Sequence, residues 1–181
     1  MPMHYVVDSL NRVIDVDAEW EAAAAGTEGG DTAMRAQVIG RALESFMIGD
    51  ATRMFMRSAL DAARLLGETR VLPYRCDSPD AQRRFEMVIS PLGDGHVQVA
   101  HRLVSQEPRQ ARKVRRPALL PAPLAGWHCT QCNAVRRPGH KAWLEEELTG
   151  PDRLALIQDV CPTCTQRLFE PATGAGEQNH A

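Results

Sequence analysis

The sequence predicts an α+β fold, in which a five-stranded antiparallel sheet carries helices on one face and a small four-cysteine module follows. Apolar residues recur at a helical period over residues 50–67, and they alternate with a period of two over residues 71–104. Two Cys-x-x-Cys pairs lie in the last third of the chain. The expected order is therefore two strands, several helices and three strands, followed by the module.

A basic, proline-rich segment divides the chain. Residues 107–126 hold five basic and one acidic side chain together with four prolines, although the whole chain has a net charge of −2. Prolines at this density disfavour helix interiors and central strands. We therefore expect a first domain over residues 1–106, a linker over 107–126, the module over 127–170 and a disordered tail over 171–181.

Two short strands and a helix open the first domain. Residues 4–7 and 12–16 have strand patterns separated by a turn. Asp17 is a suitable N-cap for a helix over residues 18–25, and Gly26 ends that helix. A further helical segment is expected from about residue 33 to residue 45.

A longer helix is predicted after Asp50, because its apolar residues follow the helical period and its charged residues fall mostly on the other side. Gly67 is a natural end for this helix. The apolar face consists of Ala51, Met54, Phe55, Ala59, Ala62 and Leu66.

From residue 71 the period changes to two, which predicts three strands. Leu72, Tyr74 and Cys76 share one face of the first strand, so Cys76 is expected to be buried. The Gly-Asp-Gly run at 93–95 predicts a hairpin between the last two strands. The inward residues of those two strands are Phe85, Met87, Ile89, Val97, Val99, His101 and Leu103. We expect Trp20, Phe55, Phe85 and Ile89 to be largely buried.

The two cysteine pairs carry the most specific chemistry of the chain. Cys129 pairs with Cys132 and Cys161 with Cys164, and 28 residues separate the pairs. Together they can form a tetrahedral four-thiolate cage, which suits one zinc ion per chain. Four thiolates leave no open position for water, so the metal is expected to be structural. Two disulfides, free thiols or a rubredoxin-like iron centre for electron transfer are the alternatives.

The first domain resembles a PAS domain over about residues 3–106. The resemblance rests on Asp8, the Arg-Val-Ile run at 12–14, Asp17 and Trp20, on the element order and on the hairpin at 93–95. The Arg-Cys-Asp-Ser-Pro run at 75–79 is similar to that of some bacterial PAS-like proteins. The module resembles a zinc-binding tail that follows bacterial sensor domains, although Gln158, Asp159 and Val160 stand where that tail has His-Gly. Its matching residues are Trp127, Cys129, Cys132, Trp143, Glu145, Cys161, Pro162 and Cys164.

The resemblance implies sensing, with a ligand between helices and sheet and a protein partner that receives the signal. The ligand is unknown. Light-sensing flavin domains of this fold carry a reactive cysteine in a characteristic helix sequence, which does not occur here. Residues 50–67, the predicted long helix, contain no histidine that could bind haem. The residues that could line the pocket are Met54, Phe55, Met56, Tyr74, Met87 and His101. The alternative for these residues is ordinary core packing, in which His101 forms a hydrogen bond with a nearby backbone group.

No catalytic motif is evident, so we expect a non-enzymatic, cytoplasmic regulatory protein without a signal peptide or membrane span. Val71, Val88 and Val104 are candidate outward apolar residues, through which the sheet would form a homodimer. The alternative is that the module folds back over this face. A transcription-associated protein that binds nucleic acid through the module and the basic linker is the second function to consider.

Overall fold

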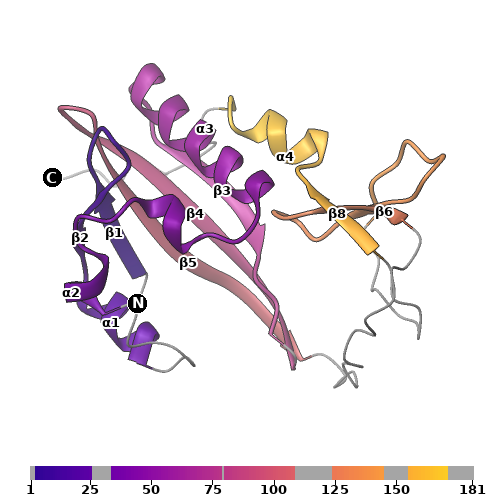
Figure 1. The fold of residues 1–181 in the computed structure, drawn as a ribbon, viewed down its shortest axis with the longest axis horizontal. Helices are drawn as coiled ribbons and strands as arrows, with labels where there is room; N and C mark the ends of the chain where they lie inside the picture. The colour runs from indigo at the N-terminus through magenta and orange to yellow at the C-terminus, as the bar shows by residue number, and fades with distance from the viewer. Residues whose placement is uncertain (1–2, 26–33, 79, 109–123, 145–154, 171–181) are drawn as a thin grey trace, which may run out of the picture.

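The computed structural model describes residues 3–25, 34–78, 80–108, 124–144 and 155–170. Its main sheet has the strand order β2-β1-β5-β4-β3, and every neighbouring pair is antiparallel (Figure 1). The strands are β1 Met3–Val7, β2 Val13–Val16, β3 Arg70–Arg75, β4 Ala81–Gly93 and β5 His96–Pro108. The five-stranded antiparallel sheet and the α+β class are therefore confirmed.

The helices lie in the chain between β2 and β3, as predicted. They are α1 Ala18–Ala25, α2 Arg35–Val38, the 3₁₀ helix η2 Leu43–Phe46 and α3 Asp50–Leu66. Asp17 caps α1, because its Oδ1 accepts a 2.7 Å hydrogen bond from the Trp20 amide. Gly67 ends α3 in the left-handed region at a φ of 64°.

The single helical segment expected up to residue 45 is wrong within the described residues. Two short helices stand there, and the chain between them pairs with β2. The Val13 amide donates to the Arg41 carbonyl at 2.9 Å, and the Gly40 amide donates to the Val13 carbonyl at 2.7 Å. These bonds replace helical ones, and Gly40 permits the change of direction because its φ is 80°. The expected loop at 26–31 lies outside the described residues.

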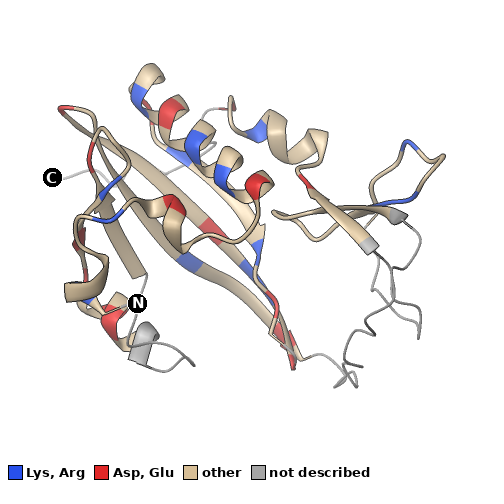
Figure 2. Ribbon diagram, in the orientation of Figure 1, with Lys and Arg blue, Asp and Glu red and all other residues tan. Residues whose placement is uncertain are grey.

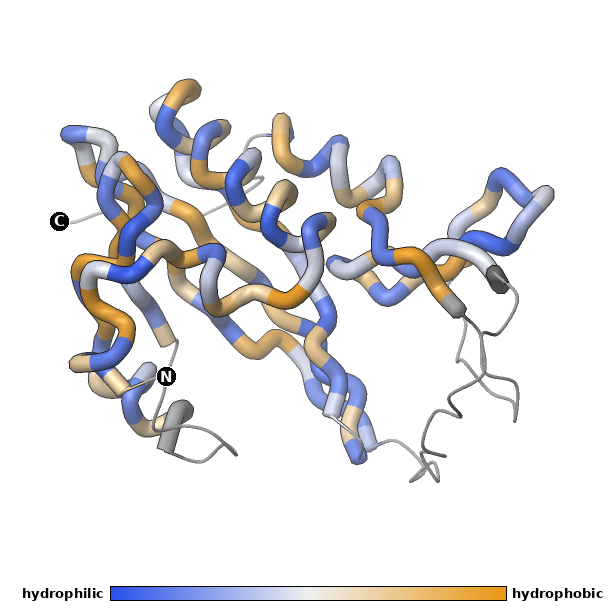
Figure 3. Tube along the Cα trace, viewed as in Figure 1, coloured by the Kyte–Doolittle hydropathy of each residue, from blue (hydrophilic) through white to orange (hydrophobic). Residues whose placement is uncertain are grey.

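One face of the sheet forms the core. The register pairs Leu72 with Met87 and Ile89 with Val99, and these four side chains are at most 3% exposed. Phe55, Met56, Ala59, Leu60 and Ala63 of α3 belong to the same core. Figure 3 shows the hydrophobic middle of β4 and β5 beneath α3 and the hydrophilic far ends of both strands. Charged residues are distributed along α3 (Figure 2).

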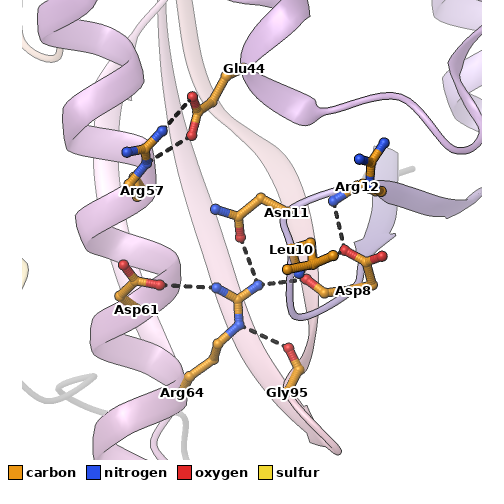
Figure 4. A network of polar contacts seen from close by, with 9 residues as sticks. All are labelled: Asp8, Leu10, Asn11, Arg12, Glu44, Arg57, Asp61, Arg64 and Gly95. Atoms are coloured by element: carbon orange, nitrogen blue, oxygen red, sulfur yellow. Dashed lines mark hydrogen bonds and ion pairs between the residues drawn. The ribbon is translucent and has the colours of Figure 1, made fainter.

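Arg64 ties α3 to two turns of the sheet (Figure 4). Its Nη2 donates to the Asp8 carbonyl and to Asn11 Oδ1, both at 2.8 Å, in the turn between β1 and β2. Its Nε donates to the Gly95 carbonyl at 2.8 Å, in the hairpin between β4 and β5. The hairpin prediction at 93–95 is confirmed, and all three of its residues have positive φ.

The described residues of the module form a second, three-stranded sheet of order β7-β6-β8 and a helix. Its elements are β6 Leu124–Cys129, β7 Val135–Arg136, β8 Ala155–Asp159 and α4 Pro162–Arg167. β6 pairs antiparallel with β7 and parallel with β8. Parallel neighbours need a long crossover. This requirement explains why so many residues separate the two cysteine pairs.

The module packs against the main sheet. Leu168, Cys129, Cys161 and Cys164 belong to the same core cluster as the sheet residues. Arg70, at the start of β3, is 1% exposed, and its Nη1 donates to the Glu170 carbonyl at 2.7 Å. The Gln158 side chain of β8 fills the space that a Cβ at Gly49 would occupy, before α3. The module therefore extends the covered side of the sheet.

The domain boundaries stay a prediction. β5 extends to Pro108, and β6 begins at Leu124. Most of the expected linker, at 109–123, and the expected tail at 171–181 lie outside the described residues. No helix in the described part of the chain is both long enough and apolar enough to span a membrane.

Candidate metal centre

The four predicted cysteines converge. Cys129 ends β6, Cys132 lies in the following turn, Cys161 is the N-cap of α4, and Cys164 lies within α4. Their Sγ atoms all lie within 4.8 Å of one another. Three of the side chains are buried, and that of Cys132 is half-buried.

Local backbone geometry holds the first pair in place. Asn133 adopts a φ of 62°, and its amide donates to the Cys129 carbonyl at 3.0 Å, which closes a tight turn around Cys132. The Cys129 amide donates to the Ala134 carbonyl at 2.8 Å. Asn133 also reaches the main sheet, because its Nδ2 donates to Asp77 Oδ2 at 3.2 Å.

The four thiols are electrostatically linked. Hydrogen bonds from the Cys132 and Cys164 thiols, and one from the Cys161 amide at 3.3 Å, hold the pKa of Cys129 far below its usual range. The bond that Cys132 gives to Cys129 raises the pKa of Cys132 to about 11. The pKa of Cys164 is raised for the same reason, by its bonds to Cys129 and then to Cys132. Without a cation, Cys129 therefore gives up its proton more readily than Cys132 and Cys164, and a bound cation would displace the protons that remain.

The donor set fits a tetrahedral thiolate-bound ion. With metal–sulfur bonds of about 2.3 Å, the sulfurs of a regular tetrahedron lie about 3.8 Å apart. Cys132 Sγ and Cys161 Sγ are 3.7 Å apart. All five cysteines are free thiols, so the disulfide alternative does not describe this structure. Zinc and iron both accept four thiolates, and the donor set does not choose between them.

A cation–π contact supports the module beside the cysteines. The Arg136 guanidinium lies 3.7 Å from the centre of the Trp127 ring and 5.6 Å from that of Trp143. His128 is close in sequence, but its Nε2 lies 3.2 Å from Asn133 Oδ1. Among the described residues, only cysteines belong to the candidate metal cluster.

The six residues expected to line a ligand pocket do not form one set. Phe55, Met56 and Met87 are buried in the core, at 8% exposure or less. Met54 is 68% exposed, so its expected position in the core or a pocket is wrong. An α-helix packs against its neighbours along one stripe of its surface, and in α3 that stripe contains Phe55. Met54 is exposed because it lies about 100° around the helix from Phe55.

Tyr74 and His101 do meet on the covered face of the sheet. The Tyr74 hydroxyl lies 2.9 Å from His101 Nδ1. The Tyr5 ring stacks on His101 at 5.7 Å between centroids. Burial lowers the pKa of His101 to about 4. A tyrosine hydroxyl, rather than the expected backbone group, therefore partners this histidine.

A cavity of about 370 Å³ lies where the module meets the main sheet. Of the six expected pocket residues, only Tyr74 lines it. Sequence reasoning missed the contributions of Phe85, Trp143 and Arg167, because contacts between the two parts leave no local pattern. Cys76 is exposed, contrary to the expected burial, because β3 ends at Arg75.

No protein-family model and no curated protein sequence matches the chain. Two solved structures are similar in part. A domain of an HTR-like protein from Haloarcula marismortui ATCC 43049 has a TM-score of 0.43 and 11% identity, over 57% of this chain and 98% of that one. A sensory box sensor histidine kinase from Vibrio cholerae has a TM-score of 0.42 and 12% identity, over 58% of this chain and 82% of that one. At these scores neither similarity carries an argument about function.

Proposed function

We propose that this chain is a non-enzymatic, cytoplasmic regulatory protein, in which a PAS-like sensing or docking domain carries a structural zinc module that contacts a protein partner. The observation that carries this proposal is the shared core. The four converging cysteines and the main sheet contribute side chains to one buried cluster. A metal bound there would stabilise a surface built from both parts.

The chemistry of the cluster supports a structural role. Four thiolates would complete the coordination of zinc and leave no position for a substrate or a reactive water. The module is too small to fold on its own core, so metal binding would supply much of its folding free energy. Zinc loading would thereby control whether the partner surface exists.

We also propose that the protein forms a homodimer through the uncovered face of the sheet. Val71 and Val88 are neighbours in register there, and both are half-buried. Ala100 continues the row on β5. Val104 does not continue this row, because it lies at a bulge of β5 and lines the cavity beside the module. Light scattering of the full chain should give twice the monomer mass, and Val88→Lys should restore the monomer.

Affinity capture from soluble extract of the native host tests the regulatory proposal. The zinc-loaded protein is compared with a Cys161→Ser/Cys164→Ser double variant and with Cys76→Ser, which changes only the exposed thiol. A protein partner that binds the wild type and Cys76→Ser, but not the double variant, supports the proposal. Retention of DNA or RNA instead would favour the nucleic-acid alternative, and turnover of a substrate would contradict a non-enzymatic role.

A further inference from the structure

The cavity at the junction has walls from both parts of the protein. Tyr74, Phe85 and Val104 come from the main sheet, and Trp143 and Arg167 come from the module. Three of the four cysteines also line it, namely Cys132, Cys161 and Cys164. A volume of about 370 Å³ is within the range of small-molecule sites.

The apolar part of the lining is aromatic and flat. The rings of Tyr74 and Phe85 stack at 5.3 Å between centroids, with an interplanar angle of 18°. Trp143 is half-buried and lines the same cavity from the module. Aromatic side chains favour stacked or edge contacts with another ring. The lining therefore suits a planar aromatic molecule.

The charges of the lining largely cancel. Arg75 forms an ion pair with Asp77 at 2.6 Å, and Glu86 forms one with Arg102. Arg84 takes part in an interaction of its own, so Arg167 is the remaining positive charge of the described lining. Four thiolates around a divalent ion would place net negative charge opposite it. An anion would be repelled by the thiolates and a cation by Arg167. An uncharged ligand fits this balance.

Two donors of the lining have no partner within the described residues. Arg167, in the last turn of α4, is half-buried, and its guanidinium makes no hydrogen bond or ion pair in that part of the chain. The hydroxyl of Thr163 likewise makes none there. A guanidinium has only donors, so it requires an acceptor such as a carbonyl oxygen.

We propose that this junction cavity binds a small, uncharged, planar aromatic molecule with an acceptor oxygen, which Arg167 holds while Tyr74, Phe85 and Trp143 enclose the ring. This inference names the ligand class of the proposed sensing function and rests on that function, because the metal-loaded module forms one wall. The ligand would contact both parts at once and would stabilise their docking.

Amide NMR of the zinc-loaded full chain tests the proposal with three matched probes. Acetophenone has the ring and the acceptor, ethylbenzene lacks the acceptor, and benzoate carries a charge. Acetophenone should shift the Trp143 indole N–H and the amides of Thr163 and Arg167. Its affinity should exceed that of ethylbenzene about fivefold, because a hydrogen bond to a charged donor contributes about 1 kcal/mol or more. Benzoate should bind more weakly than acetophenone.

Arg167→Gln should remove the advantage of acetophenone over ethylbenzene and leave the binding of ethylbenzene unchanged. Arg57→Gln is the matched control, because it removes the same charge from α3 at a residue that pairs with Glu44, outside the cavity lining. Phe85→Leu provides a second variant, which should weaken both neutral probes. Equal affinities for the three probes, no binding, or shifts confined to Val71 and Val88 would overturn the proposal.

The same samples separate this inference from the proposed function. One zinc per chain, together with dispersed amide signals from the module, shows that the module wall is intact. If the probes then fail to bind, the ligand inference is lost while the regulatory role and the metal module stand. If the protein binds no metal, the proposed function fails first, and the ligand inference fails with it.

Discussion

The Arg75 amide, at the last residue of β3, donates a 2.7 Å hydrogen bond to the carbonyl of Gln131, which lies between Cys129 and Cys132. β3 is an edge strand of the main sheet. The unpaired backbone groups of an edge strand attract other chains. The turn that holds Cys129 and Cys132 thus occupies part of this edge. If the cysteines bind a metal, its loss should perturb β3 as well as the module.

Replacement of Cys161 by serine should release the metal, since Cys161 is 3% exposed and joins the sulfur cluster. Native mass spectrometry should find one zinc in the wild type and none in the variant. Amide signals of residues 124–144 and 155–170 should collapse, those of β3 should shift, and those of β1 and β2 should persist. Cys76→Ser is the control and should retain the zinc. A red protein with an iron–thiolate spectrum would contradict zinc.

Alanine at Gly126 should disrupt the module far more than alanine at Gly139. Both glycines have positive φ, at 144° and 79°. A Cβ at Gly126 would lie 2.2 Å from the Arg136 carbonyl oxygen, whereas a Cβ at Gly139 would have no atom within 4 Å. Competition with a chelator should show weaker zinc binding for Gly126→Ala. Equal affinities in the two variants would show that β6 and β7 can separate without cost to the metal site.

Phe55→Ala should cost more stability than Trp20→Ala, although tryptophan is the larger side chain. Phe55 is 6% exposed in the core, whereas Trp20 is only half-buried and packs edge-on against Tyr5 at 5.4 Å. We expect a loss of about 3–5 kcal/mol for Phe55→Ala and about 1–3 kcal/mol for Trp20→Ala. Urea unfolding of both variants measures the two losses, and the reverse order would place Trp20 in the core.

Stability should fall as the pH drops from about 6.5 to about 4, in part because of His101. Burial lowers the pKa of His101 to about 4, below its ordinary value of 6.5. The unfolded chain therefore binds the proton first, so the contribution of His101 is complete above pH 6.5 and is lost as the pH falls towards 4. The full effect is about 3 kcal/mol. In His101→Phe the slope of unfolding free energy against pH should decrease over this window.

Local periodicity predicted most of the sheet. The alternation that contains Met87 and Ile89 places both in the core, and the cysteine spacing predicted which four sulfur atoms lie together. Periodicity predicted burial wrongly for residues at the edges of helices and strands. Met54 lies at the edge of the packed stripe of α3, and Cys76 follows the last residue of β3, so both are exposed.

The docking of the module could not be predicted from local patterns. Its contacts join residues far apart in sequence, such as Asn133 and Asp77, which are 56 positions apart. Arg70 is a further example. A basic residue on a strand is predicted to be exposed to solvent, and only a partner far away in the sequence explains its burial. Burial of its guanidinium depends on the Glu170 carbonyl and on Glu68, which lies 3.0 Å away.

The separation of Arg70 from Glu170 also has a consequence for synthesis on the ribosome. The two residues are 100 positions apart, so at about 5–20 residues per second Arg70 emerges several seconds before its partner. During that interval the nascent sheet has no C-terminal cover at β3. A hydrated guanidinium at the start of this edge strand would hinder adhesion to other nascent chains until the segment with α4 arrives.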